Sequence, residues 1–172
     1  MRRGQLEAAF HLEGKTVVGV DEVGRGCLAG PVFVAGVILD YKKLKKLSTK
    51  QRHLIRDSKT LSHDQREAVL PVIKEIAVEY KVASADVNVI EECGIVGAIF
   101  LAMKSALSSL ITPIDVVLID GLQKIPDIQY EQRALVKGDH LCYSIAAASI
   151  MAKLMRDKFM HESALEYPHY GF

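Results

Sequence analysis

The fold of this chain is decided by one stretch, Val17-Val18-Gly19-Val20-Asp21-Glu22-Val23-Gly24-Arg25-Gly26. Its first four residues are apolar and mostly β-branched, which predicts a buried strand over residues 16–21. A second apolar run at residues 31–39 predicts an antiparallel neighbour, joined to the first strand by a glycine-rich connection. Glycines leave backbone N–H groups free, so this connection can hold a phosphate or a sugar, together with the guanidinium of Arg25.

Three later segments have strand patterns. Residues 78–87 alternate between apolar and polar side chains, which predicts a strand with one solvent-exposed face. Residues 114–120 are apolar nearly throughout, which is typical of a central parallel strand, and residues 132–137 offer a last short strand. Strands that first form a meander and are later joined through helices predict a mixed α/β sheet, with ligands beside the carboxyl ends of its strands.

Helical spacing appears in three places. The first helix begins at Ser62, where Gln65 completes a capping box, and Pro71 is expected to end or bend its first part. The other two are predicted over residues 95–110 and 143–160. Residues 40–59, which precede these helices, are basic and are predicted to be irregular.

Four carboxylates lie where predicted strands or helices begin or end. Asp21 and Glu22 follow the first strand, Asp120 ends the apolar strand, and Asp139 precedes the last helix. An ionised carboxylate at the end of a buried strand costs several kcal/mol unless a cation or hydrogen bonds compensate it. Hard divalent cations prefer oxygen ligands, so the pattern predicts a metal site. The predicted metal site lies beside the glycine-rich loop that can hold a phosphate, which suggests phosphoryl chemistry.

Each of these acids also has a simpler interpretation. Asp21 and Glu22 could be a solvated strand end. Adjacent strand residues point to opposite faces, so the two acids reach one metal site only if the chain bulges or turns toward Gly24. Asp120 could be a turn acid or a helix N-cap, and Asp139 could cap the helix that follows it. The basic residues 42–59 could form a solvated loop or contact nucleic acid.

Composition restricts the class of protein. A chain of 172 residues is long enough for one domain with its own core. Lys plus Arg number 22 and Asp plus Glu number 21, so there is no overall field that would hold a polyanion without specific contacts. Cys27, Cys93 and Cys142 have no CxxC spacing, and the six histidines have no ligand spacing, which disfavours disulfides and zinc. Because no apolar run is long enough to span a bilayer, we expect a cytoplasmic protein without a membrane anchor.

Six motifs, taken in order and spacing, resemble the type 2 ribonuclease H family, bacterial ribonuclease HII. They are Gly19-Val20-Asp21-Glu22-Val23-Gly24-Arg25-Gly26, Leu28-Ala29-Gly30-Pro31-Val32, Asp57-Ser58-Lys59, Leu118-Ile119-Asp120-Gly121, Lys137-Gly138-Asp139 and Ser144-Ile145-Ala146-Ala147-Ala148-Ser149-Ile150-Met151-Ala152-Lys153. The resemblance covers nearly the whole chain. The arginine of Gly24-Arg25-Gly26 favours ribonuclease HII over the related ribonuclease HIII, where it is normally absent.

The resemblance implies a single ribonuclease H-like domain over residues 1–172, with a mixed sheet flanked by helices. It implies a monomeric enzyme that cleaves the RNA strand of RNA/DNA hybrids and incises duplex DNA 5′ to an embedded ribonucleotide, leaving 5′-phosphate and 3′-hydroxyl ends. Two Mg²⁺ or Mn²⁺ ions would serve as cofactors. By motif position, the metal-binding and catalytic acids are Asp21, Glu22, Asp120 and Asp139. Gly24, Arg25 and Gly26 would recognise the ribose 2′-OH, and Lys59 would contact a phosphate.

The chain departs from the family pattern in two places. Cys27 stands where the family usually has proline, and we expect its small thiol to pack there. Members of the family continue beyond residue 172 into a basic segment with a stacking tyrosine, so residues 161–172 are interpreted as the start of a truncated C-terminal segment. Two alternatives therefore stay open: a protein that binds hybrids without cutting them efficiently, and a metal phosphatase for small phosphomonoesters. Asp157, on the last helix, is interpreted as an ion-pair partner.

Overall fold

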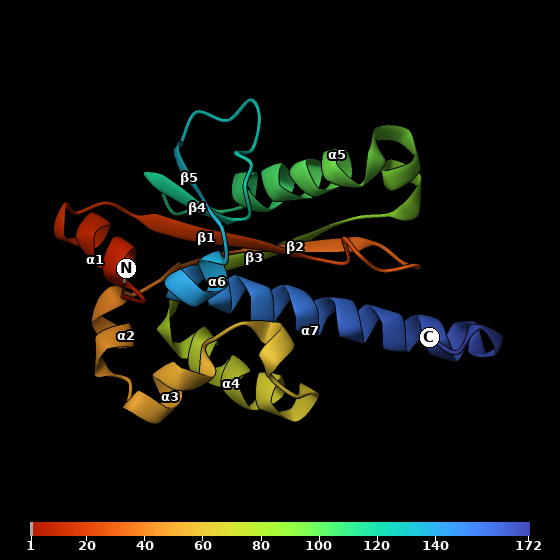
Figure 1. Cartoon of the computed structure of the whole chain (residues 1–172), viewed down its shortest axis with the longest axis horizontal. Coiled ribbons are helices and arrows are strands. Elements are labelled where there is room, and N and C mark those ends of the chain that lie inside the picture. Colours follow the sequence, from red (N-terminus) through yellow and green to blue (C-terminus); the bar gives the residue numbers. More distant parts are fainter. Residues whose placement is uncertain (1) are drawn as a thin grey trace.

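A computed structural model describes residues 2–172 and has a five-stranded sheet covered by helices on both faces (Figure 1). The strand order is β3-β2-β1-β4-β5. The bounds are β1 Val17–Val23, β2 Val32–Leu39, β3 Ala77–Ala85, β4 Val116–Asp120 and β5 Glu131–Leu135. β1 pairs antiparallel with β2, and β2 antiparallel with β3, whereas β4 is parallel to both β1 and β5. The predicted mixed sheet is confirmed, including the interior parallel strand.

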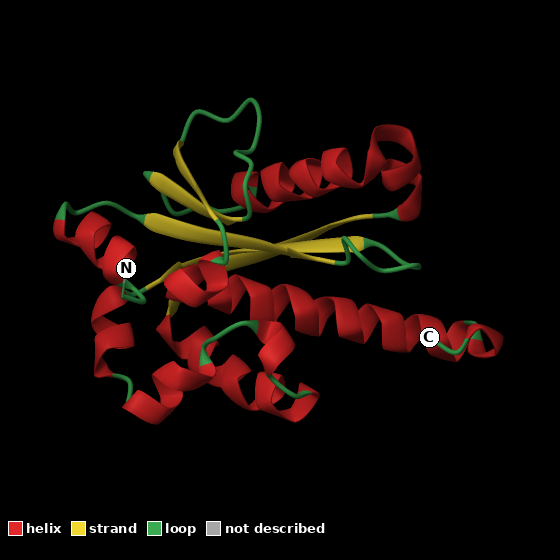
Figure 2. Ribbon diagram, in the orientation of Figure 1, coloured by secondary structure: helices red, strands yellow, loops and turns green. Residues whose placement is uncertain are grey.

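Helices make up most of the remaining chain (Figure 2). They are α1 Gln5–Leu12, α2 Tyr41–Lys46, α3 Thr49–Leu54, α4 His63–Ile76, α5 Val87–Ser108, α6 Gly138–Leu141 and α7 Tyr143–Glu166, with 3₁₀ turns η1 Ser58–Thr60 and η2 Pro168–Tyr170. In Figure 1, α5 covers one face of the sheet, and α7 and α4 lie on the other. No helix among the described residues is both long and apolar enough to cross a membrane.

The prediction that residues 40–59 are irregular was wrong, because two short helices form there. The carboxylate of Asp40 accepts hydrogen bonds from the N–H groups of Lys42 and Lys43 and so caps α2. Ser48 and Gln51 form a capping box at the start of α3. These caps satisfy N–H groups that a helix start leaves unpaired, and they compensate for the weak apolar pattern of a lysine-rich sequence.

Pro71 lies inside α4 without ending it. The predicted capping box of Ser62 is present, and the helix continues to Ile76. A proline in a helix interior costs about 3 kcal/mol. Val69 and Ile73 are fully buried in the core shared with α7, and each such side chain contributes about 1.5–3 kcal/mol, so tertiary packing outweighs that cost.

Gly19 allows the start of α7 to lie directly against β1. A Cβ atom at this position would lie 2.3 Å from the backbone nitrogen of Ile145 and 2.5 Å from the Oγ of Ser144, which no side chain can accommodate. Because Gly19 precedes Asp21 by two residues, its side of β1 is also the side of Asp21. The close approach therefore brings α7 next to this acid.

Candidate active site

Asp21 and Asp120 lie side by side on neighbouring strands. The parallel register pairs Val20 of β1 with Ile119 of β4, so the next residue on each strand is one of the two acids. Neighbouring strands are about 4.8 Å apart, and both acids alternate onto the sheet face covered by α7. The structure thus brings together two acids that are far apart in the sequence.

Asp21 is a buried carboxylate, with only 6% of its surface exposed. Burial raises the pKa of Asp21 well above its usual value, and the charges of Asp120 and Glu22 raise it further, while the nearby Ser149 hydroxyl opposes the shift. Among residues 2–172, no Lys, Arg or His lies within ion-pair distance of the carboxylate of Asp21 or Asp120. Two neighbouring carboxylates without a protein cation offer the oxygen ligands that a hard divalent cation prefers.

Glu22 leaves β1 on the opposite face from Asp21. Val18 and Val20 pack with the α5 core, so alternation places Glu22 on that face as well. The pairing with β2 continues without a bulge to Val23, so the bulge considered for this position does not form. Burial raises the pKa of Glu22, and Asp120 adds to the shift. The end of β4 therefore places Asp120 within electrostatic range of the acids on both faces of β1.

Glu22 and Asp120 line one cleft of about 440 Å³, together with Arg25 and Lys137. Arg25 approaches Glu22 to 3.8 Å, and Arg25 and Lys59 both lower the pKa of Glu22 through their charge. The cleft thus combines acids with basic side chains from the glycine-rich loop and from the Lys137-Gly138-Asp139 motif. Such a cleft can hold a cation and a phosphate at the same time.

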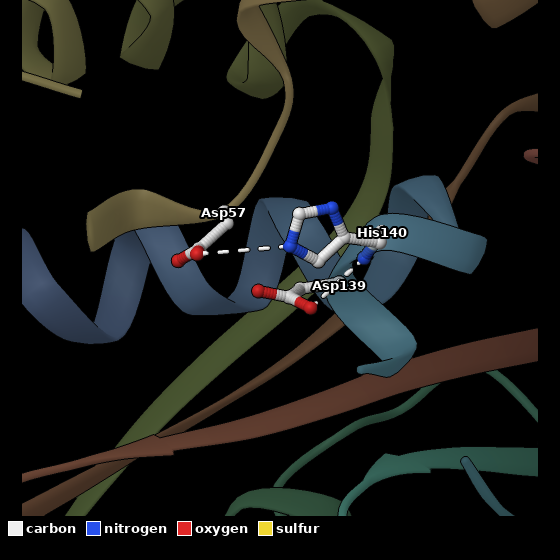
Figure 3. Close-up of side chains that lie close together, drawn as sticks. All are labelled: Asp57, Asp139 and His140. Atoms are coloured by element: carbon white, nitrogen blue, oxygen red, sulfur yellow. Dashed lines mark hydrogen bonds and ion pairs between the residues drawn. The ribbon is translucent and has the colours of Figure 1, made fainter. Parts of the chain in front are cut away.

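Asp139 lies at the start of α6, close to Asp57 and His140. Figure 3 shows these side chains converging from two elements, and one ligand atom from each lies within 4.8 Å of the others. Within residues 2–172, this is the only group of three or more such side chains that satisfies this distance. Burial raises the pKa of Asp139, and the charges of Asp120 and Asp57 add to the shift. Asp139 is therefore near Asp120, but Asp21, Glu22 and Asp120 do not belong to this close group.

Asp57 and His140 were missed as metal-site candidates by sequence reasoning. The sequence places Asp57 only in the Asp57-Ser58-Lys59 motif, and His140 has no ligand spacing to another histidine. The Nε2 of His140 lies 3.8 Å from Asp57 Oδ2, a contact that only the fold creates. The adjacency of His140 to Asp139 was the one signal in the sequence that could have drawn attention to it.

Lys59 is held by its own motif. Its backbone N–H donates to Asp57 Oδ1 over 2.9 Å, which starts the η1 turn. Ser58 is buried, and its Oγ lies 2.9 Å from the Oγ of Ser149 on α7. The turn is therefore fixed to α7, while the side chain of Lys59 is exposed and lies within electrostatic range of Glu22.

Arg156, a buried residue of α7, holds the glycine-rich loop through hydrogen bonds to its backbone. Its Nε donates to the carbonyl oxygen of Pro31 over 3.2 Å, and its Nη2 donates to that of Ala29 over 2.7 Å. Arg25 and Gly26, in the same loop, are exposed to solvent. Cys27 is exposed too, so the expectation that its thiol packs against the protein was wrong.

Asp157 forms ion pairs with Arg66, at 3.2 Å, and with Lys153. The prediction of an ion-pair role is confirmed. All three cysteines are free, and Cys142 is buried, as expected. None of these residues belongs to the cluster of acids.

Comparison with known proteins agrees with the geometry. The family model described as ribonuclease HII matches residues 18–172. The ribonuclease HII of Caldicellulosiruptor bescii is 43% identical, over all of this chain and 83% of its own length. The crystal structure of ribonuclease H2 from Pyrococcus horikoshii OT3 is similar with a TM-score of 0.68 and 25% identity, over 88% of this chain and 77% of that one. Bst-RNase HIII, solved in complex with Mn²⁺, shares the fold with a TM-score of 0.69 and 21% identity, over 88% of this chain and 55% of that one. Since the family model spans nearly the whole chain, the chain belongs to the ribonuclease HII family and is a hydrolase of the ribonuclease H type.

Proposed function

We propose that this chain cleaves the RNA strand of RNA/DNA hybrids and incises duplex DNA 5′ to an embedded ribonucleotide, leaving 5′-phosphate and 3′-hydroxyl ends. The observation that carries the proposal is the buried Asp21 beside Asp120, without an ion-pair partner among residues 2–172. Keeping two neighbouring carboxylates without a cation is costly, so a site of this kind implies a role that uses the charge. Membership of the ribonuclease HII family supports the choice of reaction.

Asp21, Glu22, Asp120 and Asp139 would hold two Mg²⁺ or Mn²⁺ ions. Their carboxylate oxygens suit hard cations, and the raised pKa values of Asp21, Glu22 and Asp139 are what uncompensated acids in a shared site should have. Bound cations would supply positive charge to the phosphate and to the departing 3′ oxygen. Asp57 and His140 lie beside Asp139, and each offers a further ligand atom within 4.8 Å of the others.

The glycine-rich loop and Lys59 would orient the nucleic acid. Gly24, Arg25 and Gly26 follow Glu22 in the loop after β1, and backbone N–H groups of such a loop can bond the 2′-OH that distinguishes RNA from DNA. Lys59 is an exposed cation within electrostatic range of Glu22, where it can bind a phosphate beside the one that is cleaved. Recognition by shape and by the 2′-OH needs few phosphate contacts, in agreement with a net charge of only +1.

The test is cleavage of a labelled DNA duplex with one ribonucleotide, in Mg²⁺ or Mn²⁺. Asp120→Asn should lose incision while circular dichroism shows an unchanged fold. Asp127→Asn is the matched control, because Asp127 is 85% exposed and pairs only with Lys104. Full activity in Asp120→Asn would contradict the proposal. Binding of hybrids without any cleavage by the native chain would also contradict it, as would hydrolysis restricted to a nucleoside monophosphate.

A further inference from the structure

Residues 3–7 lie before the region matched by the family model, yet they contact the segment that carries Asp139. The Nη2 of Arg3 donates a hydrogen bond of 2.9 Å to the backbone carbonyl oxygen of Asp139. The same guanidinium lies over the ring of Tyr143, 4.6 Å from its centroid. Next to it, the N–H of Gly4 donates to the carbonyl of Leu141 over 2.7 Å.

Glu7 fixes this segment to the start of α7. It is 3% exposed, and its carboxylate accepts hydrogen bonds from Tyr143 N at 2.7 Å, Ser144 N at 2.8 Å and Ser144 Oγ at 2.5 Å. Cys142, the N-cap residue of α7, supplies no side-chain cap. A carboxylate from α1 therefore caps α7, at the helix end where negative charge is favourable.

Asp139 depends on such contacts because α6 is too short to be stable alone. The helix spans Gly138–Leu141, and its N-cap residue, Lys137, supplies no side-chain cap. One short turn of helix is far below the length at which an isolated helix persists. On the sheet side, α6 is held through Asp120 and the N–H of Gly138, and on the other side it is held by the N-terminal segment.

We propose that Arg3 is a positioning residue for Asp139, kept in place by the Glu7 cap. Arg3 touches the backbone of this acid rather than its carboxylate, so it occupies neither carboxylate oxygen while fixing the direction in which the side chain leaves α6. The inference rests on the proposed function, because it gives Asp139 a role in metal binding. It adds an element outside the family match to the catalytic apparatus.

The test compares Arg3→Ala with Arg2→Ala, which removes the same charge from an exposed neighbour. Calorimetric titration with Mn²⁺ alone, without nucleic acid, should show about tenfold weaker binding for Arg3→Ala, as for other residues that orient a ligand. Arg2→Ala should bind as the native chain does. In an Asp139→Asn background, Arg3→Ala should cause no further loss, because the residue acts through Asp139. With the ribonucleotide-containing duplex, kcat should fall while KM stays unchanged.

Arg3→Lys keeps the charge and one donor, so it should recover part of the Mn²⁺ affinity, and it remains informative if Arg3→Ala does not fold. Equal Mn²⁺ binding by Arg3→Ala and Arg2→Ala would overturn the positioning role while leaving the proposed function intact. An equal loss with and without Asp139 would also overturn it, since that is the result of a general structural defect. A native chain that neither binds Mn²⁺ nor cleaves would instead overturn the proposed function, and the inference with it.

Discussion

The carboxylate of Asp120 accepts a hydrogen bond of 2.6 Å from the backbone N–H of Gly138. This bond joins the end of β4 to the residue that precedes Asp139. The position of one candidate ligand therefore depends on the backbone that carries another. Changes at Gly138 should affect both acids together.

Gly138→Ala should disturb this link. A Cβ at residue 138 would lie 2.7 Å from Ile145 Cδ1 and 3.2 Å from Asp120 Oδ1, so both side chains have to shift. We expect a loss of about 1–3 kcal/mol in the free energy of unfolding, as for other overpacked positions. Cleavage should fall further than stability predicts, because Asp120 moves. Urea denaturation and single-turnover cleavage measure the two effects.

Gly26→Ala is the control for the stability measurement. A Cβ there meets no atom within 4 Å, and the backbone of Gly26 is not left-handed. Its free energy of unfolding should be unchanged or slightly higher, because alanine restricts the unfolded chain. If Gly26→Ala were as unstable as Gly138→Ala, overpacking at Gly138 would not be the cause.

Asp21→Asn should stabilise the metal-free protein. The amide keeps an oxygen that can accept the 2.7 Å hydrogen bond from Glu22 N, and it removes a buried charge from beside Asp120. A gain of about 0.5–2 kcal/mol is typical when a functional site loses its strain. Added Mg²⁺ or Mn²⁺ should raise the melting temperature of the native protein and raise it less in the variant. Asp127→Asn, measured in parallel, should respond to metal as the native protein does.

The stability difference between Asp21→Asn and the native protein should depend on pH. Burial raises the pKa of Asp21, so between the unfolded value, about 3.9, and the raised folded value the native state holds more protons than the unfolded state. Stability of the native protein therefore falls as pH rises through this window. The advantage of the variant should be absent below about pH 3, grow with rising pH and then level off. Urea denaturation in chelator-containing buffers measures it, and an advantage that shrinks with pH would contradict the assignment.

The sheet could be predicted from the sequence because β-branched runs such as residues 31–39 bury both faces and leave few alternatives. Helix α1 could not be predicted in the same way. Its buried residues are Glu7 and Phe10. A buried glutamate does not indicate a core-facing helix in the sequence, because its hydrogen-bond partners at the N-terminus of α7 are known only from the fold. Short capped helices such as α2 are equally hard to detect, because local hydrogen bonds stabilise them rather than an apolar face.

The candidate site was predictable to the extent that it depends on strand register. Asp21 and Asp120 meet because each follows the apolar part of a strand, and parallel neighbours bring such positions together. Asp57, His140 and Arg156 reach the site from the start of η1, from α6 and from the far part of α7, and their contacts exist only after the chain has folded. Periodicity carries no information about such contacts.

Lys59→Ala should weaken nucleic-acid binding without changing the fold. Lys59 is exposed, and its charge lowers the pKa of Glu22, whereas Lys50 is exposed on α3 and is not among the main causes of the pKa shifts of Asp21, Glu22 and Asp139. We expect KM to rise for Lys59→Ala and the slope of log affinity against log salt to decrease by about 1. Lys50→Ala removes the same charge and should leave the slope nearly unchanged. Equal effects of the two variants would indicate a diffuse basic surface rather than a phosphate contact at Lys59.

Arg66→Met should be more harmful than Asp157→Asn, although the two residues form one ion pair. The Nη1 of Arg66 also donates to the carbonyl oxygens of Ser58, at 3.0 Å, and Leu61, at 2.6 Å. Methionine leaves these oxygens without their donor, at a cost of about 3 kcal/mol, whereas Asp157→Asn removes only its ion pairs with Arg66 and Lys153, at about 1 kcal/mol each. Because Ser58 precedes Lys59, Arg66→Met should also raise KM, and Asp157→Asn should not. Urea denaturation and steady-state cleavage measure both effects, and equal losses in the two variants would show that the ion pair, not the carbonyl contacts, holds the η1 turn.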